Sequence, residues 1–162
     1  AAINGPAIGV GLSQLMSMDH IIGAAGAKLS LRFVKVGVVP ELASSHLVPM
    51  RVGFGKASEL MLTGKTILAE EAADIGLIDQ CVEPEQLLNA AHEMAHAMGE
   101  NPQASLAFTK QLLTRNMSEA SLDDVQRLEL KMLKQAYETP EHQEAIAAFL
   151  DKREPDFKTA RG

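Results

Sequence analysis

The chain has 162 residues, a formal net charge of −6 and a hydrophobic fraction of 46%. This length is sufficient for one globular domain, since a domain of about 150 residues buries roughly 68–70% of the surface that its unfolded chain exposes. The negative charge argues against a nucleic-acid partner, because the phosphate backbone favours a basic protein face. No apolar run approaches the roughly 18 residues that a membrane span needs, so we expect no membrane segment.

Cys81 is the only cysteine, so the chain cannot form an internal disulfide. This favours a reducing compartment, and we expect a cytoplasmic location. The apolar flanks of Cys81 favour a structural role over a nucleophilic one. The first residues, Ala1-Ala2-Ile3-Asn4, include neither an initiator methionine nor a basic leader. We therefore expect the chain to be an internal segment of a longer protein.

The chain opens on a glycine-rich turn, Asn4-Gly5-Pro6-Ala7-Ile8-Gly9-Val10-Gly11, and the residues from Leu12 to Met18 can form a helix directly afterwards. Glycines allow positive φ and close approach of a ligand, and a helix start points free N–H groups at an anion. Two anions fit: a phosphate, or the oxyanion that develops when a thioester carbonyl becomes an enolate. The Rossmann and Walker patterns both fail here. Taken alone, the turn is equally consistent with a purely structural role.

The remaining sequence predicts strands first and helices later. Short apolar stretches such as residues 21–25 indicate brief buried strands joined by loops. From Pro84 onward, apolar residues recur at helical spacing, and we predict helices after Pro84, from Pro102, after a Ser121 cap and, as the last one, from Pro140. We therefore expect an α/β segment over residues 1–83 and an all-helical region over residues 84–162.

Several segments resemble the enoyl-CoA hydratase/isomerase (crotonase) family in order and spacing, and together they cover essentially the whole chain. They are Ala2 to Gly11, Asp19 to Ile22, Lys35 to Glu41, Leu62-Thr63-Gly64, Ala69 to Ala72, Gly76 to Ile78 and Ala148 to Phe157. The resemblance implies the C-terminal part of a crotonase-like spiral α/β core, followed by a helical region that forms trimers or dimers of trimers. Acyl-CoA is the implied partner, with the coenzyme A thioester as substrate and no separate cofactor.

The resemblance also assigns roles in the glycine-rich turn. In the family, the backbone N–H at the position matched by Val10 helps to hold the thioester oxygen. Gly9 and Gly11 then belong to the substrate pocket, and the second oxyanion donor comes from residues outside this chain. Hydratases of the family use two glutamates, and the matching positions here are Ser13 and Phe33. A serine without a partner is too weak a base and phenylalanine does not titrate, so hydration is disfavoured and both residues become pocket residues.

Glu41 is the candidate catalytic base. The segment before it resembles the active-site loop of Δ3,Δ2-enoyl-CoA isomerases, which place a glutamate at this point. Such an isomerase needs one base that removes the C2 proton and returns it at C4. We expect Val38, Val39 and Leu42 to desolvate the carboxylate and raise its basicity. The alternative is that Glu41 only offsets the dipole of a helix that starts after Pro40.

Other hypotheses remain open at this point. The protein can be an acyl-CoA binder that has lost its chemistry together with the glutamates replaced at Ser13 and Phe33. The segment His92-Glu93-Met94-Ala95-His96 matches the H-E-x-x-H pattern of zinc peptidases, although the third histidine of the extended pattern would fall at Pro102. Other zincins take a more distant glutamate as third ligand, and the later helices contain several. The alternative is that both histidines flank the apolar stripe of an amphipathic helix, and on this basis we expect no metal.

Phe149 and Lys152 are candidate coenzyme A contacts in the helical region. They match family residues that often reach the coenzyme A of a neighbouring subunit. The alternative is that Phe149 is a core residue of its helix and that Lys152 is a solvated charge at the helix C-terminus.

Overall fold

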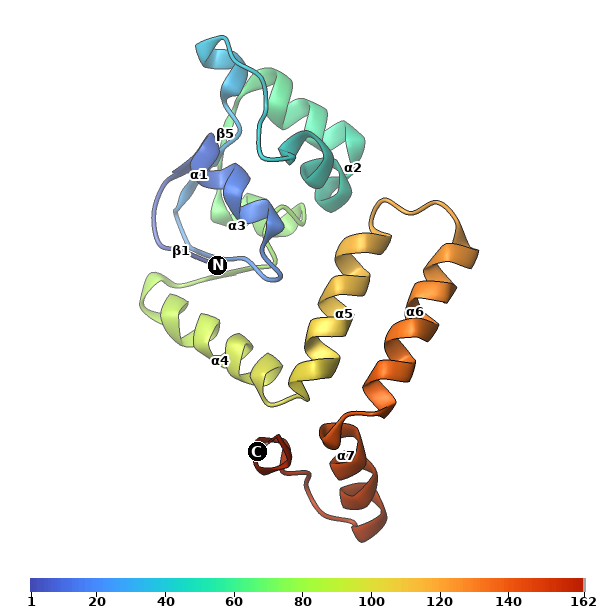
Figure 1. Ribbon diagram of the computed structural model, residues 1–162. Coiled ribbons are helices and arrows are strands. Elements are labelled where there is room, and N and C mark those ends of the chain that lie inside the picture. The colour runs from blue at the N-terminus through green and yellow to red at the C-terminus, as the bar shows by residue number, and fades with distance from the viewer. Residues whose placement is uncertain (162) are drawn as a thin grey trace. The chain divides into compact units, whose positions relative to one another are not determined.

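The computed structural model describes residues 1–161. They form two compact units, residues 1–93 and a second unit that begins at Met94. The first unit is a mixture of strands and helices, and the second consists of helices joined by short loops (Figure 1). The last described strand ends at Val82, whereas the boundary between the units lies inside α4 (Leu87–Gly99). All strands of the described chain thus lie before residue 83, and the described elements after it are helices.

Six short strands in the described chain form two small sheets within the first unit. The first sheet is parallel and has the order β1 (Ala2–Ile3), β3 (Ile22–Ala24), β6 (Gln80–Val82). The second sheet pairs β2 (Ala7–Ile8) in parallel with β4 (Lys28–Ser30), and β4 is antiparallel to β5 (Thr66–Leu68). The brief strands that the sequence predicts are thus present, and the apolar stretch over residues 21–25 contains β3.

The core of the first unit lies between these strands and the helices that follow them. Leu12, Ile21 and Leu29 have no exposed surface. A Cβ atom on Gly23 would lie 2.8 Å from the Ile78 side chain and 3.0 Å from that of Ala69, so only glycine lets this part of β3 pack so closely. α3 (Ala69–Asp74) begins at this contact.

The helix α2 (Ser44–Thr63) is the longest element of the first unit. The sequence indicated a helix after Pro40 only in the alternative explanation for Glu41, and it did not predict this extent. Pro49 lies inside it, and Gly53 has φ 76° and ψ 160°, so two helical segments meet at a kink. These two helix-breaking residues interrupt the hydrophobic periodicity from which a helix is predicted. The element forms nonetheless because Val48 and Leu60 are buried in the core.

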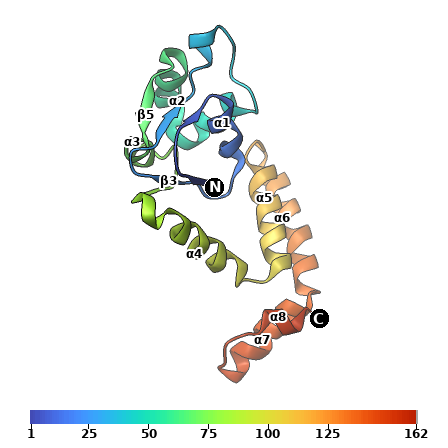
Figure 2. The same ribbon diagram turned by 90° about the vertical axis from the view of Figure 1, so that its left-hand side faces the viewer.

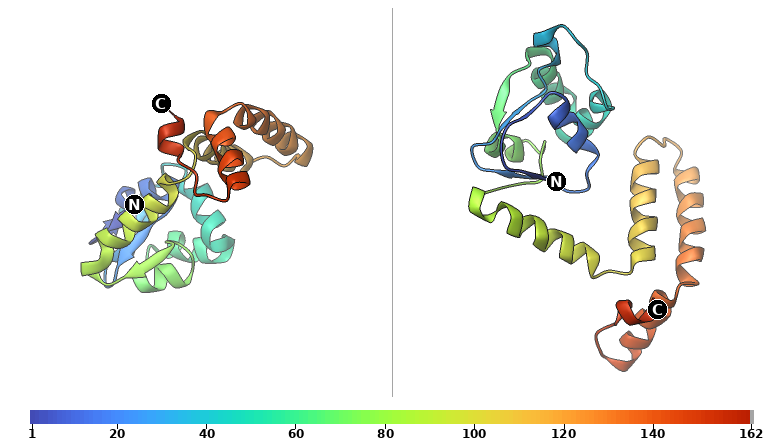
Figure 3. Two further views of the ribbon diagram at one scale, coloured as in Figure 1. Left: turned by 90° about the horizontal axis from the view of Figure 1, so that it is seen from below. Right: turned by 60° about the vertical axis from the view of Figure 1, so that its left-hand side comes forward.

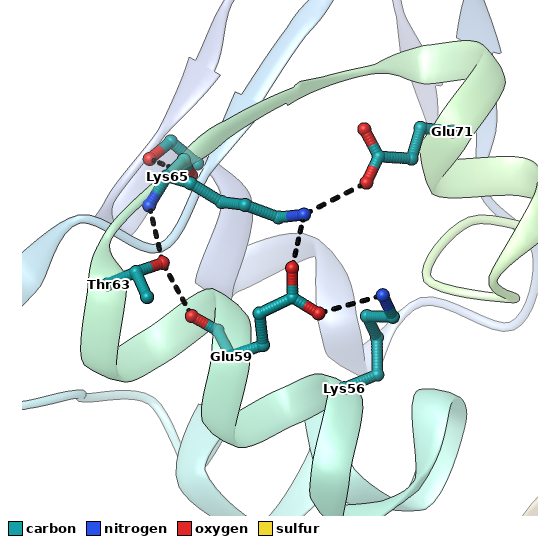
Figure 4. Close-up of polar contacts among 6 residues, drawn as sticks. Lys56, Glu59, Thr63, Lys65 and Glu71 are labelled. Carbon is teal, nitrogen blue, oxygen red and sulfur yellow. Dashed lines mark hydrogen bonds and ion pairs between the residues drawn. The ribbon is translucent and has the colours of Figure 1, made fainter.

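An exposed ion network connects the end of α2 to β5 and α3 (Figure 4). Lys56 Nζ lies 2.8 Å and Lys65 Nζ 2.6 Å from the two carboxylate oxygens of Glu59, and Lys65 also reaches Glu71 at 3.1 Å. The hydrogen bonds from Lys56 and Lys65 lower the pKa of Glu59 to about 2.

The second unit is built from consecutive helices, and Figure 2 and Figure 3 show α5 (Gln103–Asn116) and α6 (Leu122–Tyr137) lying side by side as an antiparallel pair. The predicted Ser121 cap is confirmed, because its hydroxyl accepts a hydrogen bond from the Asp124 N–H at 3.3 Å. α7 (Pro140–Asp151) begins at the predicted proline. The prediction that it is the last helix is wrong, since the short α8 (Phe157–Ala160) follows.

Glu141 is the buried charged side chain that organises the second unit. Its carboxylate accepts hydrogen bonds from the N–H groups of Gln103, at 2.8 Å, and Ala104, at 3.3 Å, and lies 2.8 Å from Arg161 Nε. A residue of α7 therefore serves the unsatisfied donors at the start of α5. In the part of the chain that the structure describes, no helix combines the length and apolar character needed to cross a bilayer.

Candidate functional site

The glycine-rich turn joins β2 to α1 (Val10–Ser13), which a 3₁₀ segment (Gln14–Ser17) extends. Gly9 has φ 57° and ψ −121°, a conformation that is open to glycine and strained for any other residue. Its N–H donates to the Ser30 carbonyl at 2.8 Å, and its carbonyl accepts from the N–H groups of Leu12 and Ser13, both at 3.0 Å. The sequence-based expectation of a helix after the turn is confirmed, with a start at Val10.

This geometry leaves two backbone donors at the start of α1. Four N–H groups at a helix start lack partners inside the helix. Those of Leu12 and Ser13 are used by the Gly9 carbonyl, whereas the hydrogen bonds found among residues 1–161 include none from the Val10 or Gly11 N–H. The donor that the family resemblance assigns to Val10 is therefore open.

A pocket of about 610 Å³ lies beside this helix start. Most of its lining is hydrophobic, with Arg32 and Glu41 as the charged members. The lining residues are Ile8, Gly9, Val10, Arg32, Phe33, Val36, Val38, Val39, Pro40 and Glu41. The structure thus brings together Gly9, Val10, Phe33 and Glu41, four of the residues assigned from the sequence, although they come from two separate stretches of the chain.

Two further residues assigned to the pocket do not line it. Ser13 is buried, with 1% of its surface exposed, and its hydroxyl donates to the Gly9 carbonyl at 3.1 Å. Because this hydrogen bond lies within the turn, Ser13 has a structural role at the helix start. Gly11 lies in α1, and a Cβ atom added there would meet nothing within 4 Å.

Glu41 lies in the loop between η2 (Phe33–Val36), a 3₁₀ helix, and α2. Its side chain is exposed. The expectation that apolar neighbours desolvate it is not met by the first unit, because Val39 is 78% and Leu42 53% exposed. Figure 1 shows the segment before α2 as a long loop without regular structure.

The backbone after Glu41 is strained. Leu42 has φ 53° and Ala43 has φ 57°, both in the left-handed region that favours glycine. The Glu41 carbonyl accepts two hydrogen bonds from Ser44, one from its N–H at 3.0 Å and one from its hydroxyl at 2.7 Å. Residues 41–44 therefore form a tight turn with positive φ at both central positions, as in a type I′ turn.

Arg32 is the charged lining residue that the sequence did not predict. It precedes the 3₁₀ helix and contributes a positive charge to a pocket that is otherwise mostly apolar. The signal that was available is its position directly before Phe33, a residue already assigned to the pocket.

The remaining candidates lie outside this pocket. Phe149 is 82% exposed on α7, and Lys152 ends that helix with φ 55°. His92 and His96 are exposed on α4. No group of three His, Cys, Asp or Glu side chains suited to a metal ion exists within residues 1–161. Cys81 is half-buried, and burial, reinforced by nearby carboxylates, raises the pKa of its thiol, which disfavours a nucleophilic role.

Fold and site together define a class: an α/β protein whose main candidate site is a largely apolar pocket beside a helix start, with one carboxylate in its lining. The sequence comparison makes this specific. The chain belongs to the enoyl-CoA hydratase/isomerase family, whose sequence model matches residues 1–160.

Individual relatives agree with this assignment. The chain is 32% identical over 153 residues to the short-chain-enoyl-CoA hydratase of Clostridium acetobutylicum, which covers 94% of this chain and 58% of that protein. It is 33% identical over 157 residues to the 1,2-epoxyphenylacetyl-CoA isomerase of Escherichia coli K12, covering 96% of this chain and 59% of that protein. The names of these relatives therefore include both hydratases and isomerases.

Solved structures share the fold. A probable enoyl-CoA hydratase/isomerase from Mycobacterium abscessus matches with a TM-score of 0.90 and 32% identity, covering 96% of this chain and 64% of that one. An enoyl-CoA hydratase/isomerase from Cupriavidus metallidurans CH34 matches with a TM-score of 0.87 and 32% identity, over 95% of this chain and 58% of that one. The chain thus spans less than two thirds of the length of these relatives.

Proposed function

We propose that this protein isomerises 3-enoyl-CoA to 2-enoyl-CoA through a thioester enolate. The observation that carries the proposal is the placement of Glu41 and the Val10 N–H in one pocket. Glu41 is the only carboxylate among the described residues that line this pocket, and an isomerase of this kind needs only one base. The coenzyme A thioester is the substrate, and the proposed reaction uses no separate cofactor.

The proposed reaction moves one proton and one double bond. The Glu41 carboxylate removes a proton from C2 of the substrate, and the electron pair of that bond moves onto the thioester carbonyl to form an enolate. The Val10 N–H donates to the enolate oxygen, and such a donor typically contributes about 10²- to 10³-fold to a rate. The enolate then collapses, the double bond moves to C2–C3, and Glu41 returns the proton at C4.

The composition of the pocket favours isomerisation over hydration. Adding water across the double bond takes a second group that positions or deprotonates the water. Phe33 in the pocket has no titrating group, and the Ser13 hydroxyl is engaged with the Gly9 carbonyl. The names of the relatives include hydratases, so the choice between the two reactions rests on these side chains.

The deciding experiment is Glu41→Gln in the full-length protein, assayed with a 3-enoyl-CoA substrate. Removing the base is expected to lower kcat by about 10²- to 10⁴-fold, the usual contribution of general acid–base catalysis. Glu85→Gln is the matched control, since Glu85 is an exposed carboxylate on the 3₁₀ turn Pro84–Gln86. Wild-type turnover in Glu41→Gln would show that Glu41 is not the base.

The second candidate function is acyl-CoA binding without turnover. It is favoured by the exposure of Glu41, because a carboxylate gains basicity from burial away from water and Glu41 is not buried in the described chain. Isothermal titration with saturated acyl-CoA, run beside assays of isomerisation and hydration, separates the two functions. Tight binding with no turnover on any enoyl-CoA would favour the binding protein.

The helical region supports a proposal about assembly and coenzyme A contacts. Leu122, Leu130 and Leu133 of α6 are between 45% and 76% exposed. We infer that such surfaces form a homotrimer or a dimer of trimers around spiral α/β cores, and that Phe149 and Lys152 contact the coenzyme A of a neighbouring subunit. Sedimentation equilibrium tests the assembly, and Lys152→Gln is expected to raise KM for acyl-CoA more than KM for the matching pantetheine thioester. The cytoplasmic location stays a prediction.

A further inference from the structure

The turn from Glu41 to Ser44 concentrates backbone strain beside the pocket. Among residues 1–161, only Leu42, Ala43 and Lys152 combine a side chain with positive φ, and two of the three are consecutive in this turn. Each such residue holds its backbone in a conformation that is less favourable than the ordinary helical or extended one. Strain of this kind persists where the surrounding structure over-determines the conformation, and it gathers at functional sites.

Ser44 supplies the contact that closes the turn. Its side chain is fully buried, and its hydroxyl donates to the Glu41 carbonyl at 2.7 Å, beside the 3.0 Å bond from its own N–H. The helix anchors Ser44 in turn, because the Ala43 carbonyl accepts from the N–H groups of His46 and Leu47, both at 2.9 Å. A buried hydroxyl has no water to replace a lost partner, so this bond is hard to give up.

The hydrogen bonds to the Glu41 carbonyl also restrict the direction of the Glu41 side chain. The carbonyl and the Cβ of Glu41 share one Cα, so fixing the plane of the following peptide restricts where the carboxylate can reach. On the other side, the ring of Pro40 fixes its own φ. Glu41 is therefore held between a stiff residue and a strained turn that Ser44 closes.

We propose that Ser44 is a positioning residue for Glu41: its buried hydroxyl holds the Glu41 backbone so that the carboxylate stays at the pocket. This rests on the proposed role of Glu41 as the base. The competing explanation is that Ser44 only stabilises the start of α2. The two differ in their consequences, because a structural role changes folding stability alone, whereas a positioning role changes the proton-transfer step.

The test compares Ser44→Ala with Ser30→Ala in the full-length protein. Ser30 is a matched control because it is also buried, with 2% exposed, and its hydroxyl donates to the carbonyls of Lys65, at 3.0 Å, and Gly64, at 3.3 Å. We expect Ser44→Ala to lower kcat about tenfold with KM within twofold of wild type, since misplacement of a reacting group by about 1 Å costs up to 10²-fold.

A deuterium isotope effect gives a readout that lost stability does not move. With substrate deuterated at C2, the isotope effect on kcat is expected to rise in Ser44→Ala, because proton transfer becomes slower relative to the other steps. Ser30→Ala is expected to lower the unfolding midpoint in urea and leave the isotope effect unchanged. If Ser44→Ala shows an unchanged kcat and isotope effect, the positioning role is wrong.

Two further substitutions test the positioning role if Ser44→Ala does not fold. Ser44→Thr keeps the hydroxyl and is expected to restore kcat, whereas Ser44→Cys keeps a similar size with a weak donor and is expected to resemble the alanine variant. Equal kcat in the two would overturn the proposal. Glu41→Gln distinguishes failure of the proposed function from failure of the positioning role. If Glu41→Gln turns over substrate at the wild-type rate, the proposed function is wrong. If Glu41→Gln is inactive and the Ser44 variants behave like Ser30→Ala, only the positioning role is wrong.

Discussion

The two units of this protein start their helices in different ways. In the first unit, no side chain caps α1, α2 or α3, whose preceding residues are Gly9, Ala43 and Leu68. In the second unit, polar side chains accept from the N–H groups at every helix start. The acceptors are Glu141 for α5, Ser121 for α6, Thr139 for α7 and Asp156 for α8.

The difference indicates a division of labour. A side-chain cap typically contributes about 1 kcal/mol to stability, so the second unit uses its polar atoms to hold its own helices. In the first unit, the helix start at Val10 keeps open donors and the start at Ser44 follows a strained turn, and both features border the candidate pocket. The helix starts of the second unit are thus stabilised by side-chain caps, whereas those of the first unit lack such caps beside the pocket where ligand binding is proposed.

The largest expected effect is at Gly9, where a substitution attacks the open helix start directly. Gly9→Ala places a side chain at φ 57° and ψ −121°, and we expect a loss of about 2–3 kcal/mol in the free energy of unfolding. Because the Val10 N–H would shift with the backbone, turnover of 3-enoyl-CoA is expected to fall by about 10²-fold. Urea denaturation and steady-state kinetics measure the two effects.

Gly11→Ala is the control for this change. Gly11 is helical, and an added Cβ would meet no atom within 4 Å. Alanine in a helix is more favourable than glycine by about 0.5–1 kcal/mol, so this variant is expected to be at least as stable as wild type. Equal destabilisation by Gly9→Ala and Gly11→Ala would show that the backbone conformation of Gly9 does not specifically require glycine.

The features that sequence predicted well are local ones. The Ser121 cap needs only a hydroxyl three residues before an N–H, and the turn at Gly9 needs only its glycines and the helix after them. The extent of the helix α2 was not predicted because Pro49 and Gly53 break its pattern, and its stability comes from buried contacts with distant strands. Glu141 was missed for the same reason, since its partners lie far away in the sequence.

The candidate site follows the same rule. Gly9, Val10, Phe33 and Glu41 were assigned together only because of the family resemblance, since no local pattern indicates that these two stretches of the chain meet. The same resemblance assigned Ser13 by position, although its hydroxyl is engaged inside the turn. The positive φ values of Leu42 and Ala43 had no sequence signal at all, because neither residue favours that conformation.

A smaller effect is expected in the second unit, where Glu141→Gln tests the capping of α5 by a distant residue. The amide can still accept from one N–H, but it loses the charge-assisted bonds to Gln103 and Arg161. We expect about 2 kcal/mol of destabilisation, in the range of hydrogen bonds to charged groups. Exposed Glu138→Gln, just before α7, serves as control, and similar urea midpoints for both variants would contradict the role of Glu141.

The smallest expected effect concerns two ion clusters, one in each unit. Hydrogen bonds from Lys56 and Lys65 lower the pKa of Glu59 to about 2, and bonds from Arg153 and the Asp156 N–H lower the pKa of Glu144 to about 2. A carboxylate whose folded pKa is depressed stabilises the fold above its unfolded pKa, here 4.5, and this contribution is lost as pH falls toward 2.

Stability is therefore expected to decline from pH 4.5 toward pH 2, and Glu59→Gln and Glu144→Gln should each make that decline shallower. The change is small because both clusters are largely solvated, and added salt should reduce it further by screening. Urea midpoints measured across this pH range in low and high salt provide the test. If the two clusters serve only their own units, the double variant should show the sum of the single effects, and a clear departure from additivity would mean that the stabilities of the two units are coupled.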